Sequence, residues 1–134
     1  MSFKGTLDTN VILRFLLKDH SSHAKTAEKI IKQAREEGKI FFVPLTVVSE
    51  LVFVLSRVYK LDRDTIARII ASLRTLPAEV EKEEVVFQAL ELYRRGMKFS
   101  DALIYCQAVA EQRTPLYTFD RDDFEGFEEI VLLS

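Results

Sequence analysis

Residues 3–17 read FKGTLDTNVILRFLL, and this stretch joins two apolar segments at a polar corner. Residues 3–7 predict a short strand, and residues 10–17 predict a helix that is apolar on nearly every side. A helix of that kind is either buried or covered by a partner. Residues 8–10 place a carboxylate, a hydroxyl and an amide where the strand ends and the helix begins. The question is why these three polar side chains lie at the joint between two apolar segments.

Strand and helix patterns alternate along the rest of the chain. Strands are expected at 3–7, 40–43, 78–82, 115–119 and 129–133, and helices at 10–17, 22–37, 47–59, 62–73, 83–95 and 101–112. Short apolar strands separated by helices are typical of a parallel sheet with helices on both faces. We therefore expect an α/β fold, a three-layer sandwich with a central, mostly parallel five-stranded sheet flanked by helices.

The length and composition fit one domain. Of the 134 residues 48% are hydrophobic, and we find no linker and no internal repeat, so residues 1–134 are expected to form a single domain. The apolar runs are shorter than the ~20 residues of a membrane span, and no secretory signal is expected. Cys106 is the one cysteine, which favours a cytoplasmic location. Its helical, apolar surroundings predict a buried packing residue.

The net charge restricts how the protein could bind nucleic acid. At pH 7 the formal charge is −2. Proteins that hold nucleic acid by bulk electrostatics are usually strongly basic. Any nucleic acid would have to meet a local basic patch, a bound metal ion or a partner protein.

A parallel sheet would bring three acids toward one edge, and a fourth, Asp101, joins them if its helix starts on that side, which the position of the next strand favours. Asp8 ends the first expected strand, and Glu50 lies in the first turns of the helix after the second strand. Asp101 begins a late helix, and Asp120 follows the fourth strand. In open α/β sheets, ligands bind beyond the carboxyl ends of the strands. The topology therefore makes these acids candidates for one site.

Clustered carboxylates need protons or a cation. Two charges about 4 Å apart repel by roughly 4 kcal/mol at an effective dielectric near 20. Mg²⁺ takes hard oxygen ligands and keeps several waters, and such an ion supports phosphoryl chemistry. The pattern thus predicts a magnesium site.

Each acid also has a purely structural interpretation. Asp8 could cap the helix that follows it, and Asp101 could complement a helix dipole. Asp120 could be a turn residue, and Glu50 could be solvated on a polar helix face. At corresponding edges of one sheet, the four together favour a shared site.

The order and local context of these acids resemble the PIN-domain nucleases. The contexts are LDTNVIL near the start, SEL after the second strand, FSDALI at the late helix and LYTFDRDDF near the end. The resemblance spans nearly the whole chain. A free-standing chain of this length looks most like the VapC toxins of toxin–antitoxin pairs.

The resemblance implies an endoribonuclease that uses Mg²⁺ or Mn²⁺ to hydrolyse single-stranded or looped RNA. The four acids would form its catalytic metal site, with polar residues at matching positions beside them: Thr9, Asn10 and Thr118. Asp122 or Asp123 could substitute for a ligand. The resemblance also implies a homodimer that is inhibited by an antitoxin protein, and no membrane association.

Some residues are candidates for contacts with RNA or a partner. Basic residues near the expected site elements could bind RNA or could be solvated surface charge: Arg14, Lys18, Lys98 and Arg121. The apolar helix at 10–17 and Phe53 could form an interface or could be buried in the ordinary way.

Two rival enzyme classes fit the motifs poorly. A haloacid-dehalogenase-type phosphatase needs a second aspartate two positions after the first, where this chain has Asn10. A response-regulator receiver domain needs a lysine after its last strand, and no lysine follows Lys98. A PIN-fold nuclease of RNA processing that is not a toxin, and a catalytically inactive PIN-fold binding module, stay open. His20 and His23 straddle a capping serine pair, so we do not interpret them as metal ligands.

Overall fold

The computed structural model describes residues 2–19 and 21–134, so His20 lies outside the described residues. The chain divides into two compact units, Met1–Glu83 and Glu84–Ser134, which are considered in turn. Among the described residues, no helix is both long and apolar enough to cross a membrane.

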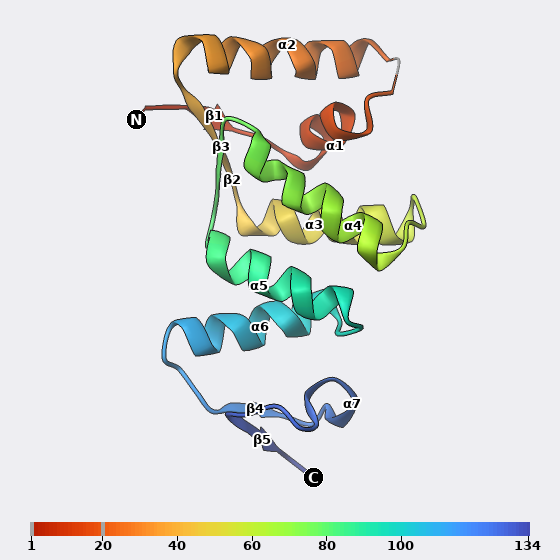
Figure 1. Cartoon of the computed structure of the whole chain (residues 1–134), viewed down its shortest axis with the longest axis vertical. Helices are drawn as coiled ribbons and strands as arrows, with labels where there is room; N and C mark the ends of the chain where they lie inside the picture. Colours follow the sequence, from red (N-terminus) through yellow and green to blue (C-terminus); the bar gives the residue numbers. More distant parts are fainter. Residues whose placement is uncertain (1, 20) are drawn as a thin grey trace. The chain divides into compact units, whose positions relative to one another are not determined.

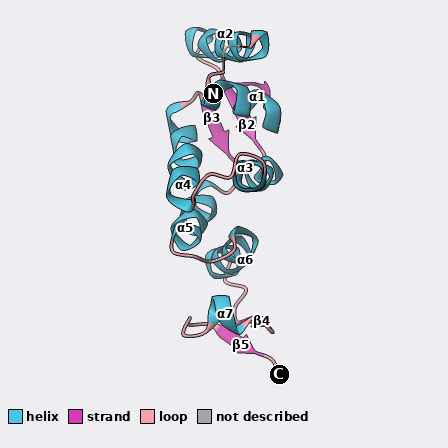
Figure 2. Cartoon of the chain, turned by 90° about the vertical axis from the view of Figure 1, so that its right-hand side faces the viewer, coloured by secondary structure: helices cyan, strands magenta, loops and turns pink. Residues whose placement is uncertain are grey.

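The first unit contains a parallel sheet of three strands in the order β1-β2-β3. The strands are β1 (Phe3–Thr6), β2 (Ile40–Val43) and β3 (Ala78–Val80). Val43 pairs with Val80, and Figure 2 shows β2 and β3 running side by side in the same direction. Leu7 N donates to Phe42 O at 3.0 Å, which carries the β1–β2 pairing to the residue before Asp8. The sheet thus fixes where the polar corner begins.

Helices follow each of the first two strands. They are α1 (Thr9–Leu17), α2 (Ser22–Glu37), α3 (Leu45–Arg57) and α4 (Arg63–Ala71), and α4 continues into a short 3₁₀ helix η1 (Ser72–Thr75). Helix α1 contacts α2 and α3, and α3 contacts α4 (Figure 1). The largest fully buried side chains come from these helices and include Ile12, Ile31, Leu51, Leu55 and Ile66. Burying such a side chain stabilises the fold by about 1.5–3 kcal/mol.

Side-chain oxygens hold the starts of these helices. Asp8 accepts from Val11 N at 3.1 Å, and Ser21 accepts from Ala24 N at 3.1 Å. These bonds satisfy amides that have no partner inside the helix. Helix α3 lacks a cap of its own, and Glu81 supplies one from beyond β3, because its Oε1 accepts from the first-turn amide of α3 at 2.8 Å.

The second unit contains the remaining elements, namely α5 (Glu83–Arg94), α6 (Phe99–Ala110), β4 (Leu116–Thr118), α7 (Arg121–Phe124) and β5 (Ile130–Leu132). Helix α5 begins at the last residue of the first unit. Strands β4 and β5 are parallel. Tyr105, Phe124 and Phe127 form an aromatic cluster, with 5.3 Å between the ring centroids of Tyr105 and Phe127. Cys106 is buried on α6, as predicted.

The expected five-stranded central sheet is wrong. The strands form a three-stranded sheet in the first unit and a two-stranded sheet in the second. All five strands occur close to their predicted positions, and all described pairings are parallel. Hydropathy identifies strands, but it does not specify which backbone amides and carbonyls pair. The prediction therefore failed at the pairing of strands.

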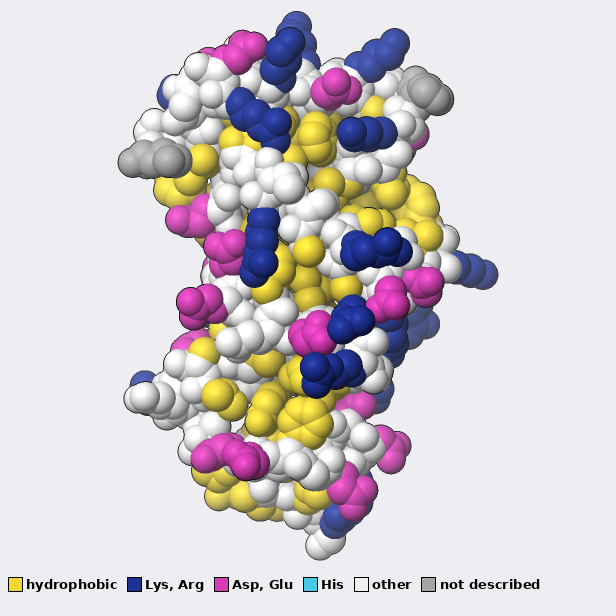
Figure 3. All heavy atoms as spheres, in the orientation of Figure 1, with side chains coloured by type: hydrophobic (Ala, Val, Ile, Leu, Met, Phe, Trp, Pro, Cys, Tyr) yellow, Lys and Arg dark blue, Asp and Glu magenta, His cyan; other side chains and the backbone are white. Residues whose placement is uncertain are grey.

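The candidate interface residues differ in exposure. Helix α1 buries Ile12 and Leu13, whereas its other apolar side chains are half-buried. Phe53 is 60% exposed, and the Arg57 guanidinium lies 5.8 Å from its ring centroid. Figure 3 shows apolar side chains reaching the surface between lysine and arginine side chains. Because it is 60% exposed, Phe53 is not buried in the ordinary way.

Candidate metal centre

Three carboxylates of the second unit lie close together. Asp101 is in the first turn of α6, Asp120 is the N-cap of α7, and Asp123 lies within α7. One oxygen from each falls within 4.8 Å of the other two. All three residues are half-buried. We call these residues the three-acid cluster.

Backbone and hydroxyl groups hold two members of the cluster in place. Thr118 Oγ1 accepts from Asp120 N at 3.0 Å, and Asp120 Oδ1 accepts from Asp123 N at 3.0 Å. Asp123 Oδ2 in turn accepts from Lys98 N at 3.2 Å, in the segment before α6. This series of hydrogen bonds links the end of β4 to the start of α6, so the carboxylates are positioned before any ligand arrives.

The pKa values of Asp101 and Asp120 are shifted in opposite directions. Partial burial, followed by the hydrogen bonds and charges of Asp123 and Asp120, raises the pKa of Asp101 to about 6. The hydrogen bond from Asp123 N lowers the pKa of Asp120, and the hydrogen bond with Asp101 and the Lys98 charge act in the same direction. Asp101 therefore holds a proton more readily than Asp120 does.

The donor set fits a small divalent cation. Three carboxylates within reach of one another supply hard oxygen ligands, which Mg²⁺ and Mn²⁺ accept. A lysine ammonium is near, since Lys98 Nζ lies 3.9 Å from Asp120 Oδ2, and the Lys98 side chain is 72% exposed. A bound cation would offset the burial and the neighbouring carboxylate charges that raise the pKa of Asp101.

The other two predicted acids lie in the first unit and are not members of the three-acid cluster. Asp8 is exposed at the N-cap of α1, and its Oδ1 makes the capping bond. Glu50 is exposed on α3. Thr9, next to Asp8, is buried and 6% exposed. The metal-binding roles of Asp8 and Glu50 stay predictions.

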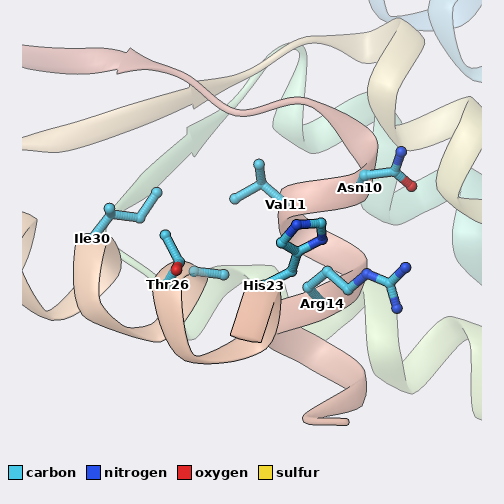
Figure 4. Close-up of a pocket in the computed structure, with 7 residues that line it drawn as sticks. Asn10, Val11, Arg14, His23, Thr26 and Ile30 are labelled. Carbon is cyan, nitrogen blue, oxygen red and sulfur yellow. The ribbon is translucent and has the colours of Figure 1, made fainter. Parts of the chain in front are cut away.

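Asn10 and Arg14 line a pocket between α1 and α2 (Figure 4). The pocket has a volume of about 410 Å³. Helix α2 contributes His23, Thr26, Ala27 and Ile30, whose spacing places them on one helix face. Figure 4 shows Asn10 and Arg14 at one end of the pocket and Ile30 at the other. Arg14 also pairs with Asp19 at 2.7 Å, so its charge is partly balanced.

The spare acids near the end of the chain differ in their roles. Asp123 joins the cluster, whereas Asp122 is exposed and outside it. The spacing Asp120-x-x-Asp123 is that of a helix start, where an N-cap residue and the residue three positions later approach each other. That signal could have identified Asp123, but the four-residue helix α7 was not predicted. Arg121, one of the candidate RNA contacts, is exposed on α7.

Comparisons with known proteins agree with the motif order. The family model described as PIN domain matches residues 6–130. The VapC ribonuclease of Aquifex aeolicus (strain VF5) is 32% identical over 99 residues, which cover 72% of this chain and 73% of that protein. The family match runs through both units and includes all four predicted acids.

Proposed function

This chain belongs to the PIN-domain family, in its VapC branch, and we propose that it is a metal-dependent endoribonuclease that hydrolyses RNA phosphodiester bonds. The observation that carries the proposal is the three-acid cluster, whose carboxylates fit a divalent cation. The ion in this proposal is Mg²⁺ or Mn²⁺. The substrate is single-stranded or looped RNA, and the protein is the toxin of a VapBC-type pair.

We further propose that the two units constitute one PIN domain, because the family match runs through both. In that domain Asp8 and Glu50 would supplement the three-acid cluster. Asp8 uses Oδ1 for its capping bond, which leaves Oδ2 for a water or an ion. Thr9 and Asn10 would support this end of the site, as Thr118 supports Asp120.

The residues of the cluster and their neighbours would have different roles in hydrolysis. A bound divalent ion would supply positive charge to a phosphate oxygen and lower the pKa of a bound water. Asp101 would be a ligand of that ion and would give up, when the ion binds, the proton that this carboxylate holds up to about pH 6 in metal-free protein, where its pKa is raised. Thr118 and the Lys98 amide keep Asp120 and Asp123 oriented. Attack by water in line would leave a 5′-phosphate and a 3′-hydroxyl.

The partners in this proposal are RNA, a second copy of the chain and an antitoxin protein. Exposed Lys98 and Arg121 and half-buried Arg14 could contact the RNA backbone. The pocket between α1 and α2 and the exposed ring of Phe53 support a protein contact in the first unit. Apolar surface of this kind is typical of interaction sites.

The proposal can be tested with a random-sequence library of single-stranded RNA. Wild-type protein with Mn²⁺ should generate new ends carrying a 5′-phosphate, and EDTA or the Asp101→Asn substitution should abolish them. A folded, Mn²⁺-binding wild type that cuts no member of the library would favour the binding-module alternative. Cleavage without growth arrest on expression would favour an RNA-processing role over a toxin.

A further inference from the structure

A pocket in the second unit shares Asp123 with the three-acid cluster. Its volume is about 430 Å³, within the roughly 300–1,000 Å³ of small-molecule sites. The lining includes Leu92, Arg95, Met97, Asp122 and Phe127 in addition to Asp123. Nothing in the metal chemistry requires this pocket, so its lining calls for a separate explanation.

One wall of the pocket is apolar and firmly held. Met97 is 6% exposed and Leu92 is half-buried. Phe127 is fixed by two edge contacts, to Tyr105 with centroids at 5.3 Å and to Phe124 at 6.3 Å. A fixed aromatic ring beside a polarizable thioether is a surface on which a nucleobase can stack.

The polar lining carries opposite charges. The Arg95 side chain is 70% exposed, and its Nε lies 3.2 Å from Glu91 Oε1. An exposed pair of this kind is weak, so the guanidinium can exchange Glu91 for a phosphate, which it can bind through two N–H groups. Asp122 is exposed and outside the three-acid cluster, so its carboxylate can accept hydrogen bonds from a ligand.

We propose that this pocket binds a guanine nucleotide of the RNA substrate, with the base on the Phe127 wall, Asp122 at its Watson–Crick edge and Arg95 on its phosphate. Guanine presents two adjacent donors, N1–H and N2–H, which match the two oxygens of a carboxylate. The other bases each place an acceptor beside their donor, which a carboxylate repels. The proposal rests on the proposed function for the identity of the ligand as RNA.

The shared residue explains what the pocket would do. Asp123 lies in both the pocket lining and the three-acid cluster, so a nucleotide held here has its phosphodiester bonds close to the cluster. Binding would position the chain for cleavage and would select for guanine near the cut. Orientation of this kind lowers a reaction barrier because it removes the entropy cost of alignment.

One residue of the pocket lining, Met97, can report ligand binding by NMR. The chain has two methionines, and Met97 is the one that lines the pocket. We would label methionine methyl groups with ¹³C and titrate metal-free protein with GMP and then AMP, at millimolar concentrations in EDTA. GMP should shift the Met97 methyl resonance, with a dissociation constant about tenfold lower than that of AMP, because only guanine satisfies both carboxylate oxygens.

Two substitutions and a matched control test the assigned roles. Arg95→Gln should weaken GMP binding by about tenfold, because a charge-assisted contact to phosphate is lost. Arg94→Gln removes a neighbouring charge that pairs with the same Glu91 but does not line the pocket, so it should leave GMP binding unchanged. Asp122→Asn should remove the preference for GMP over AMP.

The titration needs neither metal nor cleavage, so its outcome is separate from that of the proposed function. A Met97 resonance that GMP does not move, in a protein that still binds Mn²⁺ and cuts RNA, would overturn the pocket and leave the nuclease proposal standing. Equal binding of GMP and AMP in the wild type would overturn the assignment of guanine. GMP binding with the expected variant effects, in a protein that never cuts RNA, would refute the nuclease and keep the nucleotide pocket.

Discussion

Replacing Asp101 with asparagine should change stability in opposite directions with and without metal. Without metal, folding raises the pKa of Asp101 from 3.8 to about 6, so above pH 6 the ionised side chain disfavours the folded state. Asparagine removes that charge. For a partly exposed group, after solvent screening, the gain should be about 1 kcal/mol, or a Tm increase of about 3 °C at pH 8.

With Mn²⁺ bound, the wild type should be the more stable of the two proteins. An ion at ten times its dissociation constant stabilises the folded protein by about 1.4 kcal/mol. That corresponds to a Tm increase of about 4 °C in the wild type for a domain of this size. The Asp101→Asn variant should show little of this increase, because it lacks one of the three carboxylates that fit the ion.

The assay is thermal denaturation at pH 8, followed by circular dichroism in EDTA and in Mn²⁺. Asp122→Asn is the matched control, since Asp122 is exposed and lies outside the three-acid cluster. It should keep the full Mn²⁺ gain. An equal Mn²⁺ gain in wild type and Asp101→Asn would refute the cluster as the metal site. A metal-free Asp101→Asn variant less stable than wild type would refute the argument that the ionised Asp101 side chain disfavours the folded state.

Three further predictions concern the cluster and the fold. The raised pKa of Asp101 contributes stability to metal-free protein that is fully present below pH 3.8 and is lost as the pH rises through about 6. Mn²⁺ affinity should fall below pH 6, because protons compete with the ion for Asp101, and calorimetric Mn²⁺ titrations at pH 5 and 7.5 check this affinity. Thr118→Val removes the acceptor for Asp120 N, so Mn²⁺ should bind about tenfold more weakly, measured in the same titration, with little change in metal-free Tm. Ser21→Ala removes the cap of α2 and should cost about 1 kcal/mol in urea unfolding, with Mn²⁺ affinity unchanged.

The sequence predicted which elements exist better than how they pair. Strand β2 lies at the predicted residues 40–43, and α2 begins and ends where its serine cap and Gly38 indicated. These boundaries depend on local chemistry, such as caps and left-handed glycine conformations. Sheet membership depends on hydrogen bonds between distant residues, which no local pattern contains.

The same distinction holds at the site. Asp101 and Asp120 were predicted as one site because the start of the late helix and the end of the fourth strand were expected at one edge of the sheet, and the structure brings their carboxylates together. The place of Asp123 depends on α7, a helix of four residues that is too short to show a hydrophobic period. The pKa of Asp101 could not be predicted either, since it arises from burial and from neighbours 19 and 22 positions away.

The capping and ligand interpretations of these acids are compatible. Asp120 uses Oδ1 to cap α7, while its carboxylate remains within reach of Asp101 and Asp123. Capping fixes one oxygen by a backbone amide and so orients the other, which a flexible surface aspartate could not do. Asp8 has the same arrangement at α1, where Oδ1 accepts from Val11 N. The N-cap hydrogen bond therefore holds and orients a carboxylate where a strand meets an apolar helix. This explains why a polar corner lies between two apolar segments.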